Sequence, residues 1–159
     1  MFKNILIIGF GMIGSSIAQT IIHTNKTCSI YAFDKTKNLK QRVKKAKLSK
    51  IITLNSLQDI SKIKIDLIIV CTPILQYLSI FKKIEALNNN KFIVTDVGST
   101  KLKIENLYIK NKFKFKFIPA HPIAGIEKSG LENGFFGLFT NRYNIVSPIK
   151  RSSKSDINK

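Results

Sequence analysis

Apolar and polar positions divide the chain into short apolar runs separated by segments with helical spacing. The apolar runs cover residues 4–9, 28–34, 66–71, 91–98 and 115–120. The segments with apolar residues at helical spacing are 13–24, 37–47, 74–87 and 100–110. Continuous apolar runs indicate strands buried on both faces, and their alternation with helices predicts an α/β fold, doubly wound around a mostly parallel sheet. The carboxyl ends of such strands share one edge of the sheet, where ligands bind.

A glycine-rich turn follows the first apolar run and precedes a helical segment. Its sequence is G-F-G-M-I-G, the spacing of a dinucleotide-binding motif. The first glycine allows a tight turn, the second lets the backbone approach a pyrophosphate, and the third lets the helix pack close to the strand. The alternative is a turn whose glycines serve packing alone. The cofactor contacts expected from this turn are those of Gly9, Gly11, Met12, Ile13 and Gly14.

The second apolar run ends at Asp34. At this distance from the glycines, a carboxylate can accept hydrogen bonds from the adenosine ribose hydroxyls, which favours NAD over NADP because a 2′-phosphate would be repelled. Lys35 and Lys37 lie close enough in the sequence to soften this preference. Asp34 could also cap the following helix, and the two roles are compatible.

The run at 66–71 ends in Thr72 and Pro73. Pro73 stops the strand, and Thr72 presents a small polar group at the carboxyl edge, beside the first strand. We expect the nicotinamide side of the cofactor to pass here. A strand end followed by a helix start explains the same two residues equally well.

These features fit one dinucleotide-binding Rossmann domain over residues 1–149, in a chain of 159 residues that is 44% hydrophobic. Residues 150–159 are polar without apolar periodicity, and we expect a disordered polar tail. No run is long enough to span a membrane, and Cys28 and Cys71 lie in apolar runs, where a disulfide framework is not expected. These observations favour a cytoplasmic protein.

The chain is strongly basic, with 27 Lys and Arg against 9 Asp and Glu, a net charge of +18. Such a charge can indicate a nucleic-acid or membrane-surface protein. The lysines are spread over nearly every predicted helix, and no nucleic-acid-binding motif accompanies them. We therefore expect a basic surface that attracts anionic metabolites, with no nucleic-acid partner, no membrane partner and no metal.

His121 is the candidate general base. It is the only histidine in a loop at a strand end, and an imidazole exchanges a proton near neutral pH. His23 lies near the end of the first predicted helix, where a surface or capping role is the simpler interpretation. Ser99 lies at a predicted helix start, where it can cap the helix, reach the same crevice, or do both.

Three motifs together resemble the prephenate and arogenate dehydrogenase family. After the glycine-rich turn, the chain carries D-V-G-S-T-K at 96–101, H-P-I-A-G at 121–125 and I-E-K-S-G at 126–130, in that order. The resemblance extends from Lys3 to about Pro148. It implies a Rossmann domain that binds NAD.

The resemblance also implies an activity, the oxidative decarboxylation of prephenate or arogenate in tyrosine biosynthesis. In that reaction His121 would hold the ring hydroxyl while hydride leaves the same carbon, and Ser99 would orient that hydroxyl. Glu127 would line the pocket, so that Ser99, His121 and Glu127 form the expected substrate site. The alternatives are an NAD-binding module or remnant subunit without independent turnover, and a dehydrogenase of small hydroxy acids.

The chain departs from the family in three respects. We expect the helical dimerisation domain that normally follows in this family to be absent, which fits a fragment, a split gene whose partner chain supplies the helices, or a decaying gene. Arg142 is the only local side chain that could form a fork with substrate carboxylates. Ile126 stands where the family has a small hydroxyl residue, and the apolar stretch 135–139 is a candidate for a face that the missing domain would cover.

Overall fold

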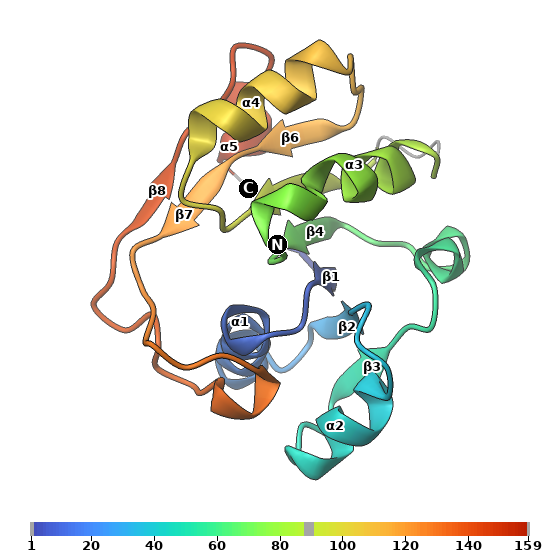
Figure 1. The fold of residues 1–159 in the computed structure, drawn as a ribbon, viewed down its shortest axis with the longest axis vertical. Coiled ribbons are helices and arrows are strands. Elements are labelled where there is room, and N and C mark those ends of the chain that lie inside the picture. The colour runs from blue at the N-terminus through green and yellow to red at the C-terminus, as the bar shows by residue number, and fades with distance from the viewer. Residues whose placement is uncertain (1, 88–90, 159) are drawn as a thin grey trace.

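The computed structural model describes residues 2–87 and 91–158, and its centre is a six-stranded parallel sheet (Figure 1). The strands lie in the order β3-β2-β1-β4-β5-β6, and every neighbouring pair runs parallel. Their bounds are β1 Asn4–Ile8, β2 Ser29–Phe33, β3 Ile51–Thr53, β4 Leu67–Val70, β5 Ile93–Asp96 and β6 Lys116–Ile118. This order confirms the doubly wound parallel sheet that the alternating pattern predicts.

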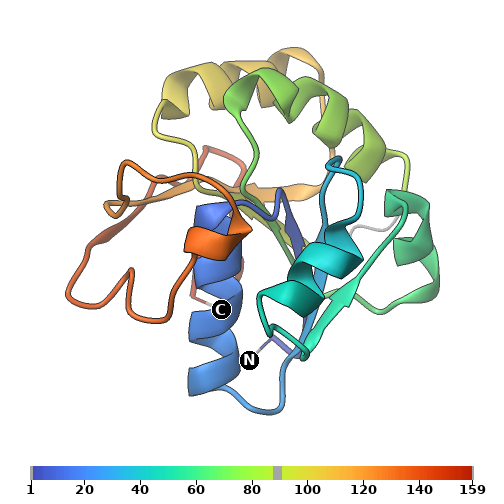
Figure 2. The ribbon, with the colours of Figure 1, turned by 60° about the horizontal axis from the view of Figure 1, so that its bottom comes forward.

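Helices cover both faces of the sheet, as Figures 1 and 2 show. On one face, α1 (Met12–Thr24) and α2 (Leu39–Lys45) bury apolar side chains against β1 and β2. On the other, α3 (Tyr77–Glu85) and α4 (Lys101–Lys110) pack on β4, β5 and β6. The short helical turns are η1 Leu57–Lys62, η2 Ile74–Gln76, η3 Leu131–Asn133 and α5 Lys154–Ile157.

Aromatic rings fill the core between α3, α4 and β6. Phe81 of α3 lies at the centre, with Tyr108, Phe113, Phe115 and Phe117 at ring-centroid distances of 5.1–6.4 Å. Edge-to-face contacts of this kind favour a single arrangement of the rings beyond the gain from apolar burial. The core therefore holds the edge strand β6, and the segment that follows it, in a fixed place.

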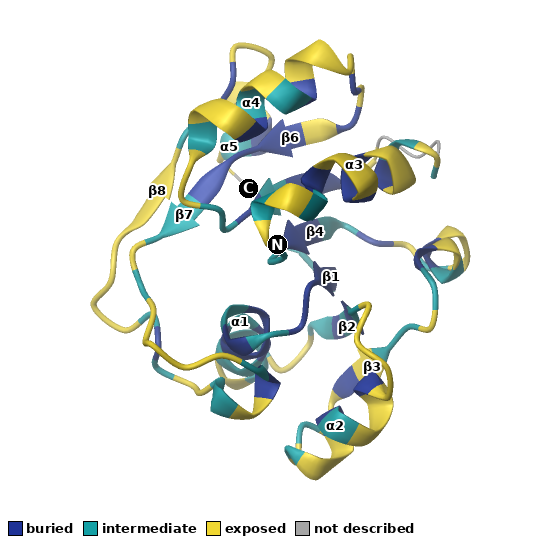
Figure 3. Ribbon diagram, in the orientation of Figure 1, coloured by how far each residue is buried: buried dark blue, intermediate teal, exposed yellow. Residues whose placement is uncertain are grey.

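Three strands, β3, β7 and β8, are not predicted from the sequence. β3 has only three residues, and Ile52 at its centre is 47% exposed, so the run is too short to stand out. β7 (Ala120–Pro122) and β8 (Asn144–Val146) pair antiparallel outside the main sheet, and all three residues of β8 are exposed (Figure 3). Their pairing joins distant segments and leaves no local pattern to detect.

The end of the chain differs from the expected disordered tail. Residues 154–157 form α5, which begins after Ser153, whose hydroxyl accepts a hydrogen bond from the Asp156 N–H. Asp156 is buried and forms an ion pair with Lys116 of β6 at 3.0 Å. Polar side chains order this segment, which is why a search for apolar periodicity fails to find it; residue 159 lies outside the described part.

Within the described residues, no helix has the length and apolar character needed to cross a membrane. Cys28 and Cys71 are free thiols. Burial raises the pKa of Cys71 well above its ordinary range, and that of Cys28 is raised too, so both side chains act as small apolar groups.

Candidate functional site

The glycine-rich loop lies between the carboxyl ends of β2 and β4. Gly9 has φ of +91°, a conformation that side chains disfavour, and its N–H donates to the Phe33 carbonyl at 2.8 Å. A β-carbon on Gly9 would lie 2.7 Å from the carbonyl carbon of Cys71. The backbone therefore passes close between the two neighbouring strands, where no larger residue fits.

Gly11 and Gly14 have opposite surroundings. A β-carbon on Gly14 would overlap the carbonyl oxygen of Gly9, so this glycine lets α1 pack against the loop. A β-carbon on Gly11 would meet nothing within 4 Å. Gly11 is the N-cap of α1 and contributes no side-chain cap, so the first-turn N–H groups of the helix have no capping side chain. Open space beside such N–H groups suits a phosphate.

Asp34 holds the glycine loop through its carboxylate. One oxygen accepts the Phe10 N–H at 2.7 Å, and the other accepts the Thr36 N–H at 2.8 Å. Burial acts to raise the pKa of Asp34, but these hydrogen bonds and the charge of Arg42 outweigh it, and the pKa lies below its ordinary value. Each oxygen keeps lone pairs that can accept from further donors, such as ribose hydroxyls.

A cavity of about 650 Å³ opens at the carboxyl edge of β1, β2 and β4. Expected cofactor residues that line it are Gly9, Gly11, Asp34, Thr72 and Pro73. Thr72 Oγ1 is buried and has no hydrogen-bond partner among the described residues. An orphaned hydroxyl in the wall of a cavity needs a polar partner, which a bound nucleotide can supply. The residues present therefore fit a dinucleotide.

Met12, Ile13 and Gly14 lie at the start of α1, outside the lining of this cavity. Met12 is buried, and its carbonyl accepts hydrogen bonds from the Ser15 and Ser16 hydroxyls. The structure thus brings five of the expected cofactor residues to one cavity and places the other three in the helix behind it.

His121 lies in β7, and its Nδ1 is 3.0 Å from the Val97 carbonyl oxygen. A carbonyl can only accept, so Nδ1 carries the proton in this contact and the neutral ring keeps Nε2 as an acceptor. Ser99 and Glu127 are exposed, and no hydrogen bond between described residues joins either of them to His121. The N-cap of α4 is Thr100, and Ser99 makes no capping hydrogen bond.

Asp96 and Lys101 form an ion pair that contacts the backbone of Ala120, the residue before His121. Lys101 Nζ is 2.7 and 2.6 Å from the two oxygens of Asp96, whose side chain is fully buried. Asp96 also accepts from Tyr77, whose pKa is raised by burial and by the Asp96 charge, so the phenol stays protonated. Burial lowers the pKa of Lys101, while Asp96 opposes this. In the sequence, Asp96 and Lys101 stand out only as members of the D-V-G-S-T-K motif, and the motif alone gives neither residue a role.

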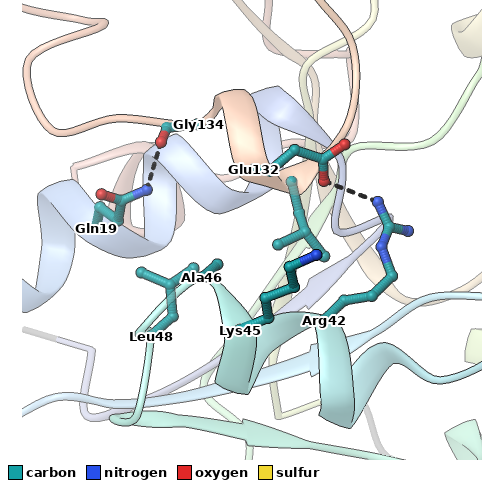
Figure 4. Close-up of a pocket in the computed structure, with 8 residues that line it drawn as sticks. Gln19, Arg42, Lys45, Ala46, Leu48, Glu132 and Gly134 are labelled. Carbon is teal, nitrogen blue, oxygen red and sulfur yellow. Dashed lines mark hydrogen bonds and ion pairs between the residues drawn. The ribbon is translucent and has the colours of Figure 1, made fainter.

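The segment 130–136 lies across the beginning of α1 (Figure 2). Ser15 donates to the Leu131 carbonyl, Ser16 accepts the Phe135 N–H, and Gln19 donates to the Gly134 carbonyl at 2.8 Å. We call this segment the strap. In Figure 4, its Glu132 reaches Arg42 of α2 at 3.0 Å beside a surface cavity.

The apolar stretch at 135–139 begins at the end of the strap, and its side chains differ in burial. Leu138 is buried, whereas Phe135 and Phe136 are 42% and 50% exposed. His23 stacks on Phe136 with ring centroids 4.4 Å apart, so it has a packing role in the structure.

Arg142 and a set of exposed apolar residues lie beside β7. Arg142 lines a cavity of about 280 Å³ together with Val97, whose carbonyl contacts His121, and Pro122 of β7. Ile123, Tyr143, Ile145 and Val146 are exposed on β8 and on the residues next to β7 and β8, and we call these four residues the apolar patch.

The strand order, the glycine loop at the β1–α1 turn and the carboxylate at the end of β2 together define a dinucleotide-binding Rossmann domain. A family model described as "Prephenate dehydrogenase, nucleotide-binding domain" matches residues 17–159. The chain belongs to this family.

Individual relatives agree with the family match. The chain is 34% identical over 149 residues to a prephenate dehydrogenase of Lactococcus lactis and 28% identical over 148 residues to a cyclohexadienyl dehydrogenase of Zymomonas mobilis, covering 91% and 93% of this chain. It spans 41% and 50% of those proteins.

A solved structure has the same architecture. Prephenate dehydrogenase of Aquifex aeolicus, in complex with hydroxyphenyl propionate and NAD+, superposes with a TM-score of 0.85 and 28% identity. The match covers 99% of this chain and 55% of that one. The chain therefore corresponds to about half the length of the relatives it matches.

Proposed function

We propose that the chain is the cofactor-binding part of an NAD-dependent prephenate or arogenate dehydrogenase. The observation that supports this proposal is that the Nδ1 of His121 bonds the carbonyl of Val97 just after β5, which leaves Nε2 without a hydrogen bond among the described residues, while Gly11, Asp34 and Thr72 line a cavity at the carboxyl ends of the neighbouring strands. A dehydrogenase needs a base and a dinucleotide at one edge of the sheet. The Aquifex aeolicus relative, which binds NAD+, supports the choice of cofactor.

In this proposal the backbone at Gly9 and Gly11 and the start of α1 hold the pyrophosphate. Asp34 accepts hydrogen bonds from the adenosine ribose, and the buried Thr72 hydroxyl finds its partner in the cofactor. NAD is preferred to NADP because a 2′-phosphate would meet the Asp34 carboxylate, although Lys35 and Lys83 also line the cavity. When bound, NAD supplies the hydride acceptor.

His121 handles the proton in the proposed reaction. Nε2 would accept the proton of the ring hydroxyl, and bound NAD would supply the acceptor for the hydride from the same ring carbon. The carbon–carboxylate bond then breaks, carbon dioxide leaves, and the ring becomes aromatic as its oxygen takes a proton back. Ser99 and Glu127 are the proposed contacts to the substrate, both on exposed loops beside β7.

The second candidate function is an NAD-binding module that turns over only with a partner chain. One observation favours it. Among the described residues, Arg142 is the one arginine beside β7 that could pair with the substrate carboxylates. The apolar patch would form the docking face for a helical partner domain. The free thiols fit a cytoplasmic location for either form.

Calorimetric titration of the purified chain with NAD and with NADP tests the cofactor site. A prephenate-dependent increase in NADH absorbance on the same sample, repeated with arogenate, tests the activity. Binding with turnover supports a self-sufficient dehydrogenase, and binding without turnover supports the module. Failure to bind either nucleotide contradicts the cofactor site itself.

His121→Asn separates the two parts of the proposal. Asparagine keeps a polar side chain but cannot act as a base at neutral pH. We expect NAD affinity within about two-fold of the parent and a loss of turnover of about 10² or more. Equal turnover in this variant would remove His121 from the mechanism.

A further inference from the structure

Three separate segments meet at the carboxylate of Asp96, which is 1% exposed. Asp96 ends β5, and it accepts the N–H of Gly98 at 2.9 Å and the N–H of Ala120, the first residue of β7, at 3.2 Å. Lys101, in the first turn of α4, bonds both carboxylate oxygens. The end of β5, the start of α4 and the start of β7 are therefore tied to one buried group.

Lys101 closes a second connection to β7. Its Nζ donates to the Ala120 carbonyl at 2.6 Å, so both backbone polar groups of Ala120 are held by the ion pair. Ala120 directly precedes His121. The imidazole of His121 donates to the carbonyl of Val97, which lies between Asp96 and Gly98. The ion pair therefore fixes Ala120, which precedes the donor His121. It also fixes Asp96 and Gly98, which lie on either side of the acceptor Val97.

Stability alone is a weak explanation for this pair. Removing two charges from water is costly, and apolar residues of similar volume often serve a fold as well. A buried ion pair with several directed hydrogen bonds instead restricts the geometry of the groups around it. Here the restricted groups are the two ends of the hydrogen bond that determines which nitrogen of His121 carries the proton.

We propose that Asp96 and Lys101 are a positioning pair that keeps His121 in the Nδ1–H tautomer, with Nε2 directed to the carboxyl edge as a base. This inference rests on the proposed function for the use of Nε2 in a reaction. The tautomer itself is a property of the chain alone and can be measured without cofactor or substrate.

Nitrogen-15 NMR of the imidazole tests the proposal. The chain has two histidines, so a His23→Gln background leaves His121 as the only signal. We expect the parent to show mainly the Nδ1–H tautomer at alkaline pH. In Lys101→Met the fraction of this tautomer should fall about two-fold or more, because Ala120 and Val97 lose their common anchor.

Tyr77→Phe is the matched control. It removes a hydrogen bond of 3.1 Å to the same carboxylate and leaves both contacts to Ala120 in place. We expect the tautomer of His121 to stay as in the parent. If Lys101→Met does not fold, Asp96→Asn is assayed in the same way because it keeps the side-chain volume.

Three results would overturn the proposal. These are a parent His121 mainly in the Nε2–H tautomer, an unchanged tautomer in a folded Lys101→Met chain, and an equal shift in Tyr77→Phe. Where turnover is measurable, Lys101→Met should lower kcat about ten-fold or more with the KM for NAD unchanged. Absence of turnover in the parent with a tautomer shift in Lys101→Met would reject a self-sufficient dehydrogenase and keep the positioning role.

Discussion

The side chain of Thr72 packs against Gly9, so closely that a β-carbon on Gly9 would lie 2.7 Å from the Thr72 methyl carbon. The hydroxyl of the same side chain is buried and has no hydrogen-bond partner among the described residues. Thr72 therefore fills space with one branch of its side chain and presents an unsatisfied polar group with the other. An unsatisfied hydroxyl costs stability, and a cofactor that bonds to it regains that cost on binding.

Thr72→Val should separate these two effects. Valine keeps the shape and removes the orphaned hydroxyl, so the free energy of unfolding of the empty chain should rise by about 1 kcal/mol. The affinity for NAD should fall about five-fold or more, because one hydrogen bond is lost. Chemical denaturation and calorimetric titration measure the two quantities.

Thr20→Val serves as its control, since the Thr20 hydroxyl already has a partner, the Ser16 carbonyl at 2.9 Å. It should leave NAD affinity unchanged and give no gain in stability. If Thr72→Val binds NAD as tightly as the parent, the hydroxyl does not contact the cofactor.

Gly11→Ala and Gly14→Ala should fail in different ways. A methyl group at position 11 meets open space, so the chain should fold normally, but the methyl occupies the place where a pyrophosphate would approach. NAD affinity should fall about ten-fold or more. At position 14 the methyl overlaps the Gly9 carbonyl, and thermal unfolding should show a loss of about 1–3 kcal/mol. A stable Gly11→Ala chain with full affinity would contradict the phosphate site.

Asp34→Asn should change both nucleotide preference and the pH dependence of stability. Because the pKa of Asp34 is lowered by its hydrogen bonds with Thr36 and Phe10 despite burial, the carboxylate stabilises the fold above the unfolded-state pKa of about 3.9. This contribution disappears as the pH falls through the lower, folded-state value. The variant should therefore lose less stability on acidification than the parent, in denaturation curves between neutral and acidic pH.

The same variant should bind NAD more weakly and NADP relatively better, because the charge that repels a 2′-phosphate is gone. We expect the ratio of the two dissociation constants to shift about ten-fold in favour of NADP. A parallel loss for both nucleotides would mean that Asp34 acts only by holding the glycine loop through the Phe10 N–H.

The nucleotide half of the site follows from local patterns. Gly9, Gly11, Asp34, Thr72 and Pro73 each lie at the end of an apolar run or within two residues of it, and the rule that parallel strands end at one edge is enough to bring them together. No knowledge of side-chain contacts is needed for that step. Their shared location can be predicted because each residue's position depends on its own strand alone.

The second half of the site depends on contacts between distant segments. Asp96 meets Ala120 only because β7 turns back toward the end of β5, and β7 in turn pairs with β8 more than twenty residues later. Both strands are three residues long and carry no alternating pattern, and Pro122 lies in one of them. Their pairing arises from tertiary packing, so sequence periodicity cannot reveal the network around Lys101.

The end of the chain offers the sharpest contrast between the sequence expectation and the structure. Deleting residues 150–159 would cost nothing if they were a disordered tail. In the structure they contribute the ion pair between Asp156 and Lys116, and the Ser152 hydroxyl donates to the Phe117 carbonyl at 3.2 Å. We therefore expect the deletion to lower the free energy of unfolding by about 1–3 kcal/mol, measured by chemical denaturation.

A point variant locates the source of this loss. Asp156→Asn keeps the side-chain shape but removes the charge that faces Lys116 at a buried position, and it should account for about 1 kcal/mol. Lys150→Ala, at an exposed position in the same segment, should change nothing measurable. If the deletion leaves stability unchanged, α5 does not contribute to the stability of the fold, and residues 150–159 behave as the sequence predicts for a disordered tail. If the deletion destabilises the chain while Asp156→Asn does not, the contribution comes from the packing of the segment on β6 and not from its ion pair.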